Sequence, residues 1–143
     1  MNTSTIEGLL GGYKVLGHEI HSQMDLYEIG KEGLPKMALI NLAKSINMSI
    51  ISLSRILNVT ERTLQRKKDL DLLNESVSEQ IIQIAEVYSR GEEVFNNIDN
   101  FQIWLDTPST ALGKKKPFEL LSSRYGAQMV LDELGRIEYG VFS

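Results

Sequence analysis

The side chains best equipped for chemistry in this sequence lie between residues 55 and 68. Five cations and one carboxylate give this short segment a charge of +4, whereas the whole chain carries −4. Guanidinium and amide groups pair with the edges of guanine and adenine, and ammonium groups suit phosphates. We therefore expect DNA contacts from the following residues: Arg55, Thr60, Arg62, Thr63, Gln65, Arg66, Lys67 and Lys68. The alternative is a solvated basic face that binds no ligand.

The order of small, apolar and turn residues predicts that a helix-turn-helix positions these side chains. Leu53, Leu57 and Leu64 stand where two crossing helices need apolar contacts. Ser54 is small enough to let the helices approach closely. Asn58 tolerates the left-handed backbone that a tight turn requires.

Capping residues set the bounds of the two predicted helices. Ser49 precedes a helix over about residues 49–57, and Thr60 precedes a second helix over about residues 61–68. Lys67 stands where such motifs often have an apolar side chain. We expect Leu70 to supply the missing apolar contact.

The remaining pattern is helical, and no segment alternates as a strand would. Helices are expected over residues 35–46, 77–95, 101–105 (capped by Asp99), 118–122 and 126–138. The fold class is therefore all-α, with a helix-turn-helix in the N-terminal half and a small helical C-terminal module. Residues 1–28 contain scattered glycines and apolar residues without a period, which predicts a mobile arm.

The composition argues against an enzyme. With no Cys and only His18 and His21, the 143 residues offer no recognisable catalytic constellation, metal site or cofactor site. A chain of this length forms one domain or two very small ones. No signal peptide and no apolar run of about 20 residues is visible, so we expect a cytoplasmic protein without a membrane span.

The segment from Phe101 to the C-terminus is unusually apolar for a chain end. It contains the only Trp of the sequence, Trp104, and the apolar pair Val141 and Phe142 stands directly before the last residue, Ser143. Chain ends are usually polar unless they are held, so this end predicts docking on this protein or on another one.

Three motifs in this segment carry a family resemblance. The runs Trp104–Gly113, Pro117–Leu121 and Gly135–Phe142 resemble the toxin-binding module of the Xre/MbcA/ParS antitoxins. The run Thr60–Arg66 is similar to the Xre-type helix-turn-helix of the same family. The resemblance covers the chain from about residue 29 to the end.

The resemblance implies a non-enzymatic antitoxin with two partners. One is a RES-domain toxin that consumes NAD, whose active-site cleft the C-terminal module covers. The other is operator DNA, bound by a homodimer or by a hetero-oligomer with the toxin. After the arm at 1–28, which carries no part of the resemblance, it also implies a DNA-binding domain at 29–73 and a toxin-binding domain at 74–143. The toxin contacts are expected from Trp104, Arg136, Glu138, Tyr139, Val141, Phe142 and Ser143.

Two alternatives stay open at this point. Trp104 is either an anchor in the interface or a core residue of its own module, and the same holds for Val141 and Phe142. The whole chain is alternatively a stand-alone helix-turn-helix regulator whose C-terminal module dimerises or senses a ligand.

Overall fold

The computed structural model of the chain describes residues 3–140. Within this range the chain forms ten α-helices, one 3₁₀ helix and no strand, which confirms the predicted all-α class. The helices are α1 (Thr3–Leu9), α2 (Tyr13–Leu16), α3 (Gln23–Glu32), α4 (Lys36–Ser45), α5 (Ile50–Ile56), α6 (Glu61–Arg66), α7 (Glu75–Phe95), α8 (Ile98–Leu105), η1 (Thr110–Leu112), α9 (Pro117–Leu120) and α10 (Arg124–Glu138).

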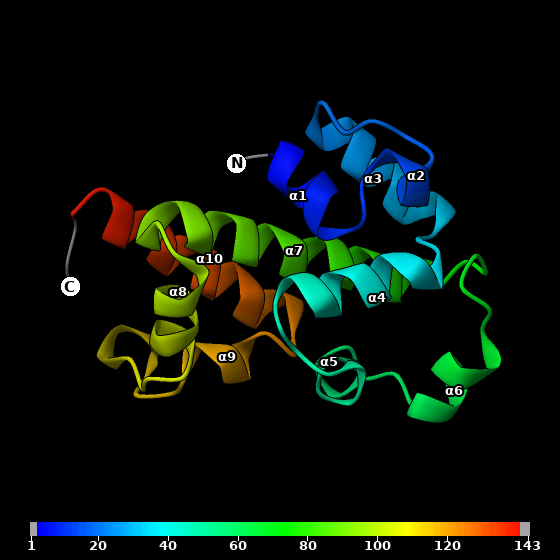
Figure 1. Ribbon diagram of the computed structural model, residues 1–143. Coiled ribbons are helices and arrows are strands. Elements are labelled where there is room, and N and C mark those ends of the chain that lie inside the picture. Colours follow the sequence, from blue (N-terminus) through cyan, green and yellow to red (C-terminus); the bar gives the residue numbers. More distant parts are fainter. Residues whose placement is uncertain (1–2, 141–143) are drawn as a thin grey trace.

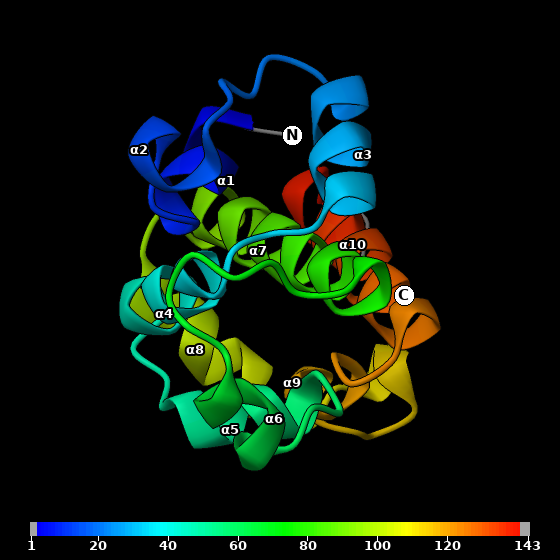
Figure 2. The same cartoon turned by 90° about the vertical axis from the view of Figure 1, so that its right-hand side faces the viewer.

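The long helix α7 is the centre of the fold. The Asn74 side chain caps its start by accepting from the Val77 amide at 2.8 Å, and Asn96 ends it in a left-handed conformation at φ 56°. Helices α1, α3, α8 and α10 all contact it, as Figures 1 and 2 show from two sides. Because α7 has neighbours on several sides, its buried residues cover more than one face.

The first helices belong to the core. Ile6 and Leu10 are fully buried and Ile20 is 2 % exposed. Helix α3 starts with a capping box between Ser22 and Asp25, a local arrangement that fixes its first turn. The expected mobile arm is therefore wrong for the described residues before 29. Short helices separated by glycines give no periodic pattern, and their burial comes from contacts with α4 and α7.

A cluster of aromatic rings holds the C-terminal half together. Phe101 on α8 is fully buried, and its ring lies 5.3 Å from that of Tyr88, 5.9 Å from Phe95 and 5.9 Å from Trp104. Rings at these separations attract one another in addition to burying area. Helix α8 begins earlier than expected, because the cap is the Asn97 side chain and not Asp99.

One hydrophobic core runs through both halves of the chain. The structure therefore joins the proposed domains closely, and their boundaries at 28/29 and 73/74 stay a prediction. Main-chain hydrogen bonds between the segment after α6 and the start of α4 help to join the two halves. The Leu73 amide donates to the Leu34 carbonyl at 2.7 Å, and the Lys36 amide donates to the Asp71 carbonyl at 2.9 Å.

Candidate functional site

Local interactions form the helix-turn-helix at α5 and α6. Ser49 and Thr60 cap the two helices through side-chain oxygens that accept from the amides of Ser52 and Thr63, both at 3.1 Å. Asn58 adopts φ 57° between them. The predicted caps and turn are confirmed, and each depends on residues within three or four positions, which is why the sequence reveals them.

Apolar and small residues hold α6 against the rest of the molecule. Leu53 is fully buried and Leu64 is 2 % exposed, so each side chain takes the core position that its spacing predicts. Ser54 is also buried, and its hydroxyl donates to the Ile51 carbonyl at 2.7 Å. A six-residue helix cannot persist alone, so these contacts fix its orientation.

The exposed face of this motif carries most of the predicted DNA-binding side chains. Those that reach solvent freely are Arg55, Arg62, Gln65, Arg66 and Lys68. Thr60 and Thr63 are also exposed, but their hydroxyls lie 2.8 Å apart and form the cap.

Lys67 differs from its neighbours. It is partly buried, and its ammonium donates to the Leu72 carbonyl at 3.1 Å. Leu70 does not replace the missing apolar contact, because it is 77 % exposed. The expectation for Leu70 is wrong: the main chain of residues 69–73 turns back to the start of α4 and leaves that side chain outside.

The predicted C-terminal residues divide into two groups. Trp104 is partly buried, with its ring 5.7 Å from Phe95 and 5.9 Å from Phe101, so it belongs at least in part to the module's own core. Tyr139 is 78 % exposed at the end of α10. Val141, Phe142 and Ser143 lie outside the described residues.

The carboxylate of Glu138 is engaged within the chain. Both of its oxygens accept from Arg90 on α7, at 2.6 and 2.7 Å, in a bidentate pair. The hydrogen bonds from Arg90 lower the pKa of Glu138, and the same contacts raise the pKa of the guanidinium. This pair holds the end of α10 against α7. The two residues lie 48 positions apart in the sequence, so no local sequence pattern predicts the contact.

Arg136 also has an internal partner. Its Nε donates to Glu133 at 2.8 Å, and the Arg136 side chain remains 43 % exposed. The spacing of three positions on one helix is one at which opposite charges meet, so this pair was readable from the sequence.

Three side-chain amides connect the helix-turn-helix to the C-terminal helices. Gln102 on α8 donates to the Ile46 carbonyl at 3.0 Å, and Gln80 on α7 donates to the Ile56 carbonyl at 3.0 Å. Asn58, the turn residue itself, donates to the Ser122 carbonyl at 3.4 Å. These contacts hold the two halves in a fixed relation.

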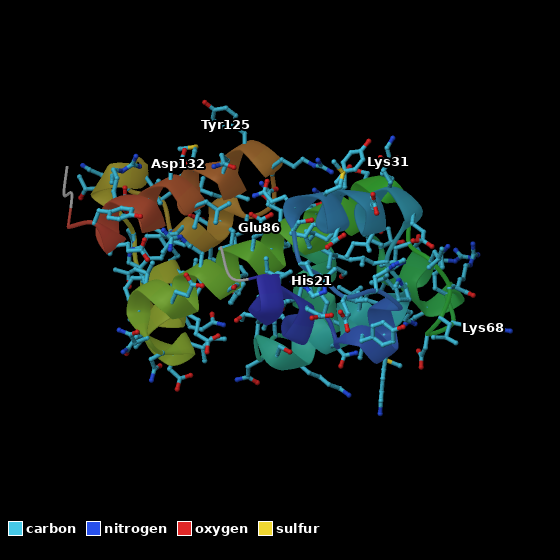
Figure 3. All side chains as sticks on the ribbon, turned by 90° about the horizontal axis from the view of Figure 1, so that it is seen from above. His21, Lys31, Lys68, Glu86, Tyr125 and Asp132 are labelled. Atoms are coloured by element: carbon cyan, nitrogen blue, oxygen red, sulfur yellow. The ribbon has the colours of Figure 1, made fainter. Side chains whose placement is uncertain are left out.

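The basic helix and the end of α10 lie at opposite ends of the molecule. Figure 1 shows α6 at one end and the C-terminal turn of α10 at the other, with α7 spanning between them. Figure 3 agrees from above, since Lys68 lies at the end opposite to that turn. The exposed basic side chains of α6 and the exposed end of α10 therefore belong to separate surfaces.

Other candidate chemistry in the described part of the chain is limited to surface pairs. His18 bonds Glu32 at 3.2 Å, and His21 bonds Glu19 at 2.8 Å. The Glu19 contact raises the pKa of His21. Within residues 3–140 no single helix has the length and apolar content of a membrane span; only α4 and α5 together, bent by 109°, reach it by length and composition.

Comparisons with known proteins assign most of the chain to two antitoxin domains. The family model described as the antitoxin Xre-like helix-turn-helix domain matches residues 25–86. The model described as the antitoxin Xre/MbcA/ParS C-terminal toxin-binding domain matches residues 90–140. A relative named Antitoxin Xre, from Yersinia enterocolitica serotype O:8, is 33 % identical over 91 residues, a match that spans 62 % of each of the two chains.

The chain belongs to the Xre family of antitoxins.

In this Xre-family chain the two matched regions meet within α7. The helix-turn-helix match ends at residue 86 and the toxin-binding match starts at residue 90. Both therefore use the same central helix as a support, which explains why one core serves both halves. The matched helix-turn-helix region also begins at residue 25, inside α3, so that helix belongs with the core it packs on.

Proposed function

We propose that this Xre-family protein is an antitoxin that neutralises a RES-type NAD-consuming toxin and represses its own operon. Its C-terminal module covers the active-site cleft of the toxin, and its helix-turn-helix binds the operator as a homodimer and in a hetero-oligomer with the toxin. The observation that carries the proposal is the pair of family matches on one small chain, one over the helix-turn-helix and one over the C-terminal helices. A protein that works on DNA in this way acts in the cytoplasm.

In the proposed DNA complex, α6 enters the major groove. Arg62, Gln65 and Arg66 have the donor geometry to read base edges, while Arg55 and Lys68 contact phosphates. Thr60 and Thr63 contribute mainly by capping the helix, since their hydroxyls already bond one another. Lys67 contributes charge from a partly buried position.

Operator binding by purified variants tests this half of the proposal. Arg66→Ala should weaken binding to the operator by about 1–3 kcal/mol and relax its sequence preference. Lys68→Ala should weaken binding to all DNA sequences alike and reduce the slope of log affinity against log salt by about one. Lys14→Ala, which removes an exposed charge on α2, is the control. If all three variants bind the operator with the affinity of the wild-type chain, the DNA site lies elsewhere.

In the proposed toxin complex, the exposed end of α10 approaches the cleft. Tyr139 supplies apolar area with a polar tip, and Arg136 can exchange Glu133 for a toxin carboxylate. Glu138 acts by holding this helix end on α7 through Arg90. Trp104 supports the module from its aromatic cluster, and the proposal adds Val141, Phe142 and Ser143 as direct contacts.

Removal of residues 139–143 tests the toxin half of the proposal in cells that also express the neighbouring toxin gene. The truncated chain should lose protection while its circular dichroism and melting temperature stay close to those of the full chain. The double variant Arg62→Ala, Arg66→Ala is the matched control, because it should lose repression and keep protection. If the truncated chain still protects the cells, the C-terminal residues do not contact the toxin as proposed. If the neighbouring gene does not encode a toxin, a stand-alone regulator is favoured.

A further inference from the structure

A groove on the side of the molecule away from α6 is not accounted for by either proposed surface. Helix α7 forms its floor, α3 forms one wall and the start of α10 forms the other, enclosing a hollow of about 280 Å³. Figure 3 shows Glu86 on α7 between α10 and the N-terminal helices. The side chains that matter below are Leu26, Tyr27, Glu79, Ile82, Glu86 and Arg124.

The cations around this groove already have partners. Arg124 pairs with Glu79 at 3.0 Å and also donates to the Ser76 carbonyl at 3.4 Å. Lys31 on α3 pairs with Glu75 at 3.6 Å and lies 5.9 Å from the centre of the Tyr27 ring. These two cations therefore have ion-pair partners other than Glu86.

Glu86 is a carboxylate of this groove that has no ion pair among the described residues. Among residues 3–140 no ion pair or hydrogen bond engages its carboxylate. Partial burial raises the pKa of Glu86 by more than the charge of the N-terminal amino group lowers it, which means that the folded chain disfavours the charged form. A residue that opposes stability is commonly retained for binding, because a ligand can supply the missing opposite charge.

The rest of the groove suits a long aliphatic cation. Leu26 and Ile82 are buried at its base, and the Tyr27 ring is 57 % exposed along the α3 wall. The methylene stem of a lysine or arginine packs on such apolar surface while its charged head reaches a carboxylate. An aromatic ring beside the path adds attraction for the cation.

We propose that the groove between α3, α7 and α10 receives a lysine or arginine side chain of the toxin, which pairs with Glu86 and packs along Tyr27. This inference rests on the proposed function, because it takes the toxin as the partner. The α10 wall belongs to the region matched by the toxin-binding domain model, residues 90–140, so the groove continues that surface. The floor at Glu86 and the α3 wall lie outside that match, so the toxin footprint extends onto the N-terminal half.

The charge of the groove favours a basic protein segment over DNA as its partner. A groove whose free charge is a carboxylate repels phosphates, whereas it attracts a basic protein segment. A second copy of this chain could also supply a basic side chain. Measuring the self-association of the chain distinguishes this partner from the toxin.

Titration calorimetry between the full-length chain and the purified toxin encoded by the neighbouring gene tests the inference. Glu86→Gln keeps the shape of the side chain and removes its charge, and it should weaken binding by about tenfold or more. Glu61→Gln is the matched control, since Glu61 is exposed on α6, outside the groove and outside the toxin-binding match, and it should change the affinity by less than about twofold. Tyr27→Ala should weaken binding, whereas Tyr27→Phe should retain it because the ring makes the contact.

The outcomes are distinct. Weaker binding by Glu86→Gln at an unchanged or higher melting temperature supports the groove, since unfolding cannot explain the loss. Wild-type affinity in Glu86→Gln and Tyr27→Ala overturns the groove and leaves the proposed function standing. Loss of self-association with unchanged toxin affinity also overturns it, in favour of a second copy. If the wild-type chain does not bind the toxin, the proposed function itself fails.

Discussion

Replacing Gly91 by alanine tests the aromatic cluster that supports the C-terminal module. Gly91 is buried on α7, and an added Cβ would meet three carbons of the Phe101 ring, Cζ, Cε1 and Cε2, well inside van der Waals contact. Phe101 has no exposed surface, and the rings of Tyr88, Phe95 and Trp104 surround it. The ring therefore cannot move aside without disturbing its neighbours.

Two opposing effects set the size of the change. Overpacking a well-filled core costs typically about 1–3 kcal/mol, and a clash with three ring atoms at once belongs at the upper end of that range. Alanine gains about 1 kcal/mol over glycine inside a helix. The net loss is about 2 kcal/mol, which for a domain of this size lowers Tm by about 6 °C.

Gly135→Ala is the matched control for this experiment. Gly135 also lies inside a helix, but an added Cβ there meets nothing within 4 Å, so the stabilisation of about 1 kcal/mol from the higher helix propensity of alanine should appear alone. Urea denaturation and thermal melting of both variants measure the difference. A Gly91→Ala protein as stable as the wild type would show that Phe101 is not fixed by its neighbours, and the reasoning would fail.

Three further predictions concern single positions. Glu86→Gln should stabilise the chain at neutral pH. Folding raises the pKa of Glu86, so the charged carboxylate destabilises the folded chain. This destabilisation is absent at pH values below about 4, where the carboxyl is protonated in both states, and it grows as pH rises through the folded pKa. Urea denaturation should therefore show the higher stability of Glu86→Gln only at the higher pH values. Asn58→Ala should lower stability by about 1 kcal/mol through its left-handed backbone, whereas Asn58→Gly removes only the long hydrogen bond to Ser122; melting temperatures of the two variants separate these effects. Thr60→Ala should cost about 1 kcal/mol through the lost cap and Thr60→Ser should not, again by melting.

Local interactions explain why much of the fold was predictable. The caps at Ser49 and Thr60 and the turn at Asn58 all form where the sequence predicts them. Each depends on a side chain and a backbone group a few positions apart. The long helix α7 was also predictable, because its apolar residues recur at helical spacing over 21 residues.

The places where the prediction failed depend on distant contacts. Leu70 looked like a core residue and is exposed, because the chain after α6 is held at Leu34 and Lys36. The first helices looked like an arm, yet Ile6 and Leu10 are fully buried against elements far along the chain. No pattern within a short window contains that information.

The same division applies to the functional surfaces. The types and spacing of residues at 53–68 and 104–142 were enough to indicate an Xre-family antitoxin, since a helix-turn-helix and a terminal motif are encoded locally. The sequence therefore determined the helices, their caps, the basic face and the family. Only the tertiary structure decided that Arg90 binds Glu138, that Trp104 joins an aromatic cluster, that the two surfaces lie at opposite ends, and that Glu86 lacks a partner within the described chain. The reason is physical: which charges meet, and which are left over, depends on helices brought together across dozens of residues by a shared core.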